Sequence, residues 1–133
     1  MLSARTIALI AVALASGAWS QALAAQQAAT PLPDGVTPAR IDAGAKLYQG
    51  PGMCFVCHGQ DAKGTVGPNL TDAVWIHSKG TFPEIVQQIL AGVPASQSKS
   101  GVMMPPRGGA DLSADQVEAV AAYVWGLSHP RGK

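Results

Sequence analysis

The sequence of 133 residues is poor in charge, in aromatic residues and in cysteine. Charged residues make up 13% of the chain and aromatic residues 5%, and nine Lys and Arg nearly balance eight Asp and Glu. A chain without a basic excess lacks the electrostatic footprint of a nucleic-acid-binding protein. No strand-like alternation and no internal repeat is present, so an all-helical protein with a small core is expected.

The amino terminus contains the one long apolar run of the chain. Arg5 precedes an almost continuous apolar stretch over residues 7–19, and Ala22 and Ala24 form a small-residue pattern behind it. This order of basic, apolar and small residues is typical of a secretory signal peptide. An uncleaved membrane anchor is the alternative, but a helical run of that length reaches about 20 Å against a hydrocarbon core of about 30 Å. We therefore expect a signal peptide over residues 1–24.

Cleavage after Ala24 would export a soluble, periplasmic product without stable membrane insertion, because no later apolar stretch is long enough to cross a bilayer. A retained leader would tether the product to the membrane instead. The polar, proline-containing residues 25–36 are expected to form a flexible lead-in. Residues 37–133 are expected to form a single domain, as their number suits one core and not two.

Capping signals and apolar spacing predict three short helices in this domain. The first begins at Thr37 and stops at Gly50, the second runs from Thr81 to Gly92, and the third runs from Ser113 to Pro130. Two long loops separate them, over residues 59–75 and 93–109. Loops of that length in a compact domain generally serve a function, and three short helices make a thin core. The pattern indicates that a bound group fills the middle.

The segment Cys54-Phe55-Val56-Cys57-His58 has the C-x-x-C-H spacing of a c-type haem attachment site. Each thiol adds to one of two vinyl groups on the same porphyrin edge, and the next residue presents its imidazole to the iron. A thioredoxin-like dithiol would require a preceding strand. A structural zinc site requires four ligands, and only two further histidines, His77 and His129, are available. The motif therefore predicts haem c, with Cys54, Cys57 and His58 as attachment and ligand residues.

The sixth iron ligand determines whether the haem transfers electrons or binds small ligands. Met53 adjoins the attachment site and cannot reach the far haem face, while His77 and His129 lie in polar surroundings. Met103 and Met104 lie in the second long loop. Pro105 biases Met104 toward extended backbone, where neighbouring side chains point in opposite directions. We therefore expect one of these two methionines to face the iron.

The chain resembles the class I cytochrome c family over residues 38–127. The likeness is carried by the C-x-x-C-H segment, Gly67-Pro68-Asn69-Leu70, Met104-Pro105-Pro106 and the terminal helix with Ala122-Tyr123-Val124-Trp125. The resemblance implies an all-α class I cytochrome c fold, with three to five short helices and long loops around one covalently bound haem per chain. It also implies that the Pro68 carbonyl accepts a hydrogen bond from His58, that Met104 is the axial methionine, and that Gly44 meets Tyr123 where the first and last helices cross.

Within that family the motifs look like the cytochrome c modules of haem–copper oxidases. The resemblance implies a one-electron carrier of a periplasmic respiratory chain that is not itself an enzyme. Its partners would be redox proteins, namely an oxidase, a dehydrogenase or a quinol-oxidising complex. Two alternatives stay open: a haem c subunit of a membrane-associated oxidase or dehydrogenase complex, and a ligand-binding or peroxidase-like haem protein.

Overall fold

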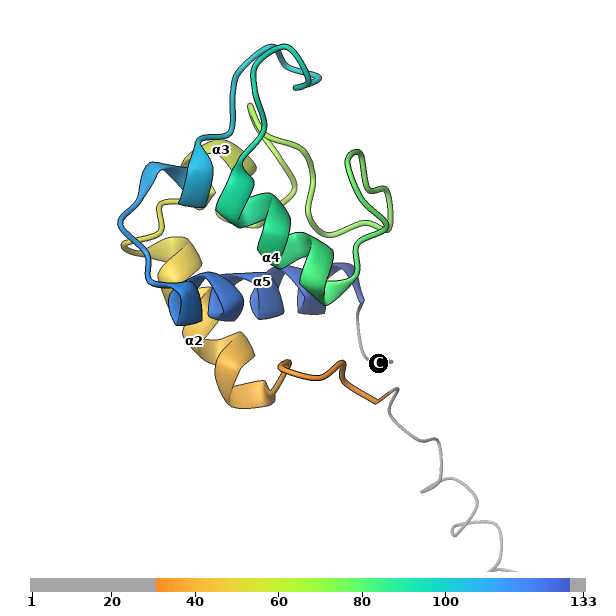
Figure 1. Ribbon diagram of the computed structural model, residues 1–133, viewed down its shortest axis with the longest axis vertical. Helices are drawn as coiled ribbons and strands as arrows, with labels where there is room; N and C mark the ends of the chain where they lie inside the picture. Colours follow the sequence, from red (N-terminus) through yellow and green to blue (C-terminus); the bar gives the residue numbers. More distant parts are fainter. Residues whose placement is uncertain (1–30, 130–133) are drawn as a thin grey trace, which may run out of the picture. The chain divides into compact units, whose positions relative to one another are not determined.

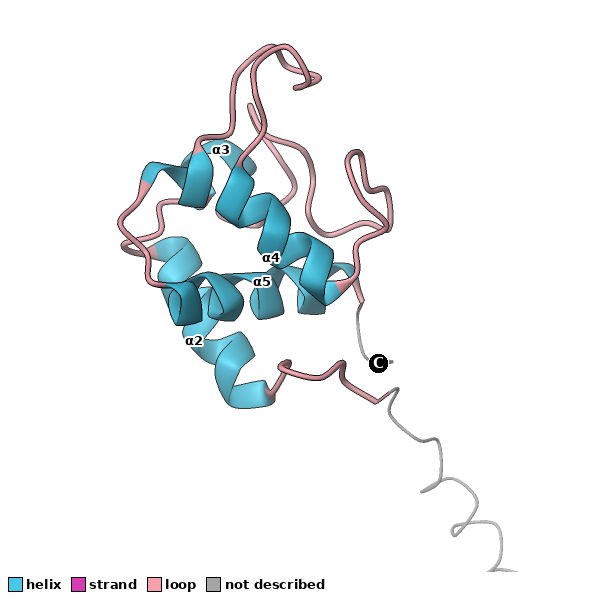
Figure 2. Cartoon of the chain, viewed as in Figure 1, coloured by secondary structure: helices cyan, strands magenta, loops and turns pink. Residues whose placement is uncertain are grey.

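The computed structural model describes residues 31–129, so the expected signal peptide over residues 1–24 lies outside the described residues. The described part is helical, with loops between the helices (Figures 1 and 2). The elements are α2 (Pro38–Gln49), α3 (Phe55–His58), α4 (Phe82–Ala91), the 3-10 helix η1 (Pro106–Gly109) and α5 (Ala114–Ser128). Between residues 31 and 129, no helix has the length and apolarity to cross a bilayer. The expected all-α fold class is confirmed.

Each of the three helices expected from the sequence starts where its capping residue stands. The Thr37 hydroxyl accepts a hydrogen bond from the backbone N–H of Arg40, 3.1 Å away, and Pro38 occupies the first turn of α2. At α4 the Glu84 carboxylate accepts from the backbone N–H of Thr81, and at α5 Ser113 and Gln116 satisfy each other's backbone N–H groups. These bonds pair donors that helix formation leaves without an intrahelical partner.

Helices α2 and α5 cross at a glycine. A methyl group added at Gly44 would collide with the carbonyl group of Ala119 and lie 2.8 Å from Cβ of Tyr123, so only glycine permits this approach. The expected contact between Gly44 and Tyr123 is therefore present. One turn along α2, the Tyr48 ring packs edge-on against the Tyr123 ring at a centroid distance of 5.3 Å.

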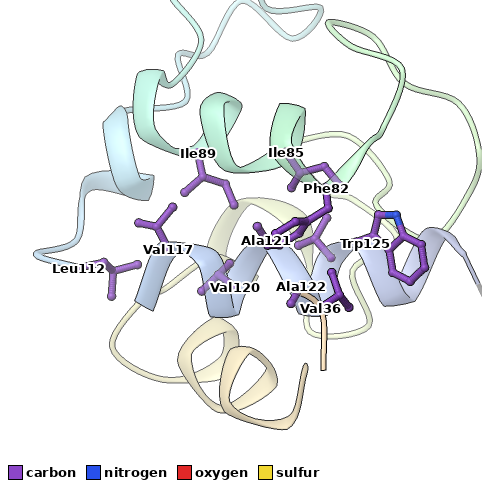
Figure 3. Close-up of a cluster of buried hydrophobic side chains, with 11 residues drawn as sticks. Val36, Phe82, Ile85, Ile89, Leu112, Val117, Val120, Ala121, Ala122 and Trp125 are labelled. Atoms are coloured by element: carbon purple, nitrogen blue, oxygen red, sulfur yellow. The ribbon is translucent and has the colours of Figure 1, made fainter. Parts of the chain in front are cut away.

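The core cluster includes Ile85 and Ile89 of α4 and Val117 and Val120 of α5, and Figure 3 shows Ile89 and Val117 pointing toward one another between the two helices. Val36, which falls in the expected lead-in, is 4% exposed and belongs to this core. The packed part of the chain therefore begins before the first helix.

Two short helices and one backbone pairing were not expected from periodicity. Helix α3 and the 3-10 helix η1 are each four residues long, too short to produce a periodic apolar pattern. Val93 and Met104 pair as an isolated antiparallel bridge through two hydrogen bonds of 2.8 and 2.9 Å. The bridge closes the loop that extends away from the helices in Figure 1.

Candidate cofactor site

A cavity of about 420 Å³ opens beside α3 and is walled by α3, α4, α5 and both long loops. Ile85 and Ile89 of α4 and Val120 and Val124 of α5 form its apolar floor. Its volume falls within the range of about 300–1,000 Å³ that is typical of ligand and cofactor pockets. The cavity lies where the sequence predicted that a bound group replaces part of the core.

His58 lies at the end of α3 with its ring fixed on two sides. Its Nδ1 is 2.9 Å from the carbonyl oxygen of Pro68. A carbonyl oxygen can only accept, so Nδ1 donates and the neutral ring has its lone pair on Nε2. A Cβ added at Gly67 would lie 2.9 Å from ring atoms of His58, so glycine lets the chain pass against the imidazole. Burial lowers the pKa of His58, opposed by the bond to Pro68, and so favours the neutral imidazole that binds metals.

Cys54 and Cys57 stand one turn apart at α3, and both line the same cavity as His58. Both cysteine side chains are of intermediate exposure. Burial, more than the neighbouring Cys57, raises the pKa of the Cys54 thiol to about 11. The turn of helix brings two thiols and one imidazole, the three groups of the C-x-x-C-H motif, to one wall.

The two methionines of the second loop differ in exposure. The Met103 side chain is 52% exposed, whereas Met104 is half-buried and packs against the core. Both line the cavity. The bridge to Val93 fixes the backbone of Met104 and leaves Met103 outside the pairing. Of the two side chains, that of Met104 therefore lies deeper in the protein.

The remaining candidates for the sixth ligand are less well placed. Met53 and His77 line the cavity but are exposed, Met53 to 50%. His129 is not among the lining residues; its ring stacks on Trp125 at a centroid distance of 4.5 Å. The structure therefore separates His129 from the cavity.

Two cations line the cavity, and in the described part of the chain no carboxylate does. They are Lys99, which is exposed, and Arg107, which is partly buried. The Arg107 guanidinium donates to the carbonyl oxygen of Leu112 at 2.6 Å. The sequence did not single out either residue for a role, because a lone cation in a loop carries no spacing signal.

An all-helical chain that folds around an apolar cavity next to a C-x-x-C-H helix has the architecture of a c-type cytochrome. The chain belongs to the family described as cytochrome c oxidase, cbb3-type, subunit III, whose sequence profile matches residues 39–124. The predicted likeness to the cytochrome c modules of haem–copper oxidases is thereby confirmed. Membership of a cytochrome c family implies covalently bound haem c.

Curated relatives carry the same family description. The chain is 38% identical over 94 residues to the cbb3-type cytochrome c oxidase subunit CcoP of Rhodobacter capsulatus, covering 67% of this chain and 30% of that protein. It is 37% identical over 91 residues to the subunit FixP of Sinorhizobium medicae, covering 66% of this chain and 30% of that protein. The chain thus spans about a third of the length of the relatives it matches.

A solved structure shares the fold. The crystal structure of cytochrome cL from Methylophaga aminisulfidivorans superposes with a TM-score of 0.56 at 24% identity, covering 71% of this chain and 57% of that chain. At this identity the likeness supports the class I cytochrome fold alone.

The residues of the site fit haem c. The group requires two thiols for its thioether bonds and an imidazole for the iron, and all three line one wall of the cavity. Its plate is apolar, as are the facing residues of α4 and α5. Its carboxylates are anionic, which matches a cavity lined by two cations. A methionine in the loop that closes the cavity offers the thioether ligand of electron-transfer cytochromes.

Proposed function

We propose that this chain is a one-electron carrier with a single haem c, joined through Cys54 and Cys57 and ligated by His58 and Met104. The sequence contains two cysteines, enough for one doubly attached haem. The observation that carries the proposal is the position of His58, which lines the cavity with both thiols while Pro68 holds its Nδ1. When bound, the haem supplies an iron that cycles between the ferrous and ferric states.

The chain's own residues hold the site in one arrangement during that cycle. Pro68 keeps the proton on Nδ1 of His58 and so leaves Nε2 as the ligand atom. The bridge from Val93 holds the backbone of Met104 in place. Ile85 and Ile89 exclude water from the interior wall. A closed, rigid site changes little between oxidation states, which suits transfer of electrons without chemistry on a substrate.

We further propose that the partner is a haem–copper oxidase and that the chain works on the periplasmic side. The relatives' names support the oxidase. Exposed apolar side chains beside the attachment site support a docking patch: Val56 is 61% exposed, and Met53 and Met103 are about half exposed. A small apolar patch suits the brief contacts of electron-transfer partners. Fractionation of host cells followed by detergent solubilisation separates a carrier from a bound oxidase subunit, since only the subunit then co-purifies with the oxidase.

The experiment for the ligand set is an optical spectrum of the ferric and ferrous protein together with carbon monoxide binding. The wild type is expected to show the weak near-infrared band of methionine–iron ligation and to exclude carbon monoxide. Met104→Ala should lose the band, bind carbon monoxide and have a midpoint potential lower by on the order of 100 mV or more, since axial ligands tune haem potentials over about 0.8 V.

Met103→Ala is the matched control, because it removes an identical side chain from the adjacent position. It should keep the band. Loss of the band in Met103→Ala and not in Met104→Ala would exchange the two roles. A wild type without the band that binds carbon monoxide readily would instead support the ligand-binding or peroxidase-like alternative.

A further inference from the structure

The main chain just after His58 is held by a side chain from another helix. Gly59 ends α3 with φ of 82° and ψ of 156°, a conformation available almost only to glycine. Its carbonyl oxygen accepts a hydrogen bond of 2.8 Å from the Tyr48 hydroxyl, and this bond is buried. The next carbonyl, that of Gln60, accepts from the Gln49 side-chain amide at 2.6 Å. Two side chains at the carboxyl end of α2 thus donate hydrogen bonds to the carbonyls of the two residues that follow the predicted iron ligand.

Tyr48 is itself rigidly placed. Its side chain is 0% exposed, and its ring rests against Tyr123 of α5 at a centroid distance of 5.3 Å. Tyr48 also lines the cavity together with His58. A tyrosine side chain has only two torsions and a fixed length. The packing of the Tyr48 ring between α2 and α5 therefore fixes where its hydroxyl lies at the end of α3.

The hydrogen bond from Tyr48 affects the imidazole of His58 because the next residue, Gly59, has a flexible backbone. On the amino side of His58, helix α3 and the two proposed thioether bonds fix the backbone. On the carboxyl side stands a glycine, which loses more conformational freedom on ordering than any other residue. The backbone N–H of Gly59 donates to the Phe55 carbonyl and that of Gly64 to the His58 carbonyl, both at 2.8 Å. Beyond these bonds, the Tyr48 hydroxyl at 2.8 Å and the backbone N–H of Ala62 at 3.1 Å hold the Gly59 carbonyl itself.

We propose that Tyr48 is a positioning residue for His58: through the Gly59 carbonyl, its hydroxyl fixes the direction in which the imidazole leaves the backbone toward the iron. This inference rests on the proposed haem site. Pro68 sets the rotation of the ring from one side, and Tyr48 sets the backbone from the other. A phenylalanine at position 48 would fill the same space and leave the carbonyl of Gly59 with one donor fewer.

The test compares Tyr48→Phe with Tyr123→Phe in the haem-loaded full chain. The two tyrosines pack against each other, but within the described residues only the Tyr48 hydroxyl makes a hydrogen bond to the protein. Paramagnetic proton NMR of the ferric protein gives the ring resonances of His58, and voltammetry gives the midpoint potential. Tyr48→Phe should shift both relative to the wild type, and Tyr123→Phe should shift neither.

Two further measurements distinguish a positioning role of Tyr48 from a general loss of protein stability. Exchange of the Ala62 amide, which shares the Gly59 carbonyl, reports local opening at this point and should accelerate in Tyr48→Phe but not in Tyr123→Phe. The chain has two tyrosines, so 3-fluorotyrosine incorporated into Tyr123→Phe labels Tyr48 alone. Its more acidic phenol is a stronger donor, and the His58 resonances should move opposite to the direction seen in Tyr48→Phe.

Each contrary result has one meaning. A Tyr48→Phe protein that melts earlier while its His58 resonances and potential stay at wild-type values would make Tyr48 a structural residue only and overturn the inference. Equal shifts in Tyr48→Phe and Tyr123→Phe would also overturn it. A wild type that lacks ring resonances of an iron-bound His58 would overturn the proposed haem site and this inference with it.

Discussion

Gly44→Ala tests whether the crossing of α2 and α5 depends on the missing side chain. The added methyl carbon would lie 2.6 Å from the carbonyl carbon of Ala119 and 2.8 Å from Cβ of Tyr123, where ordinary contacts begin at 3.4 Å. Both neighbours belong to the helix framework, so no rotamer change relieves the overlap and the helices must move apart. Such overpacking costs about 3 kcal/mol, and the better helix propensity of alanine returns about 1 kcal/mol. The expected net loss of unfolding free energy is about 2 kcal/mol.

Gly126→Ala is the matched control on the opposite helix. There the nearest atom outside α5's own backbone would be Cδ1 of Ile41 at 3.6 Å, an ordinary contact. The same substitution should therefore stabilise the protein by about 1 kcal/mol through helix propensity. Thermal unfolding of the haem-loaded proteins, followed by far-ultraviolet circular dichroism, should show a Tm about 10 °C lower for Gly44→Ala and about 5 °C higher for Gly126→Ala. Shifts of the same sign in both variants would refute the close-approach argument.

Two further predictions concern charge. Arg107→Gln removes one of the two cations that line the cavity, which favours the more positive ferric state and should lower the midpoint potential by tens of millivolts, where 59 mV is about a tenfold change in a one-electron equilibrium. Lys63→Gln, outside the cavity lining, is the control, and an equal effect in both would show that net charge and not placement matters. Glu84 has a pKa lowered mainly by the hydrogen bond from the Thr81 side chain, so its contribution to stability is present above pH 4.5 and is lost as the pH falls through the lowered value. Glu84→Gln should therefore reduce the loss of stability between pH 6 and pH 3 in denaturant titrations, and an unchanged pH profile would contradict that role.

The helices were predictable because their signals are local. Thr37 with Pro38 and the capping boxes at Thr81 and Ser113 start helices through hydrogen bonds between residues three apart, and such bonds need no tertiary context. Helix α3 was missed for the opposite reason. Four residues form a single turn, whose stability comes from the surrounding loop and not from an apolar period.

The chemistry of the site was also local. Two thiols and an imidazole within five residues define the attachment segment whatever the remainder of the chain does, because the porphyrin vinyl groups require that spacing. The resemblance added the expectation that Pro68 holds His58. The structure places Nδ1 and the Pro68 carbonyl 2.9 Å apart, although ten residues separate them.

Contacts between residues that are distant in the sequence were determined only by the tertiary structure. Nothing in the spacing of Tyr48 indicates that its hydroxyl reaches Gly59, or that Arg107 lines the same cavity as His58. The residues alone left Met103 and Met104 open as the sixth ligand. In the structure Met104 pairs with Val93 and is partly buried, whereas Met103 is about half exposed, and the assignment of Met104 as the ligand stays a prediction. Local sequence determined the helix starts and the attachment chemistry, since both depend on neighbours within a few residues. Packing determined which side chains surround the cavity, since that depends on how α2, α4 and α5 meet.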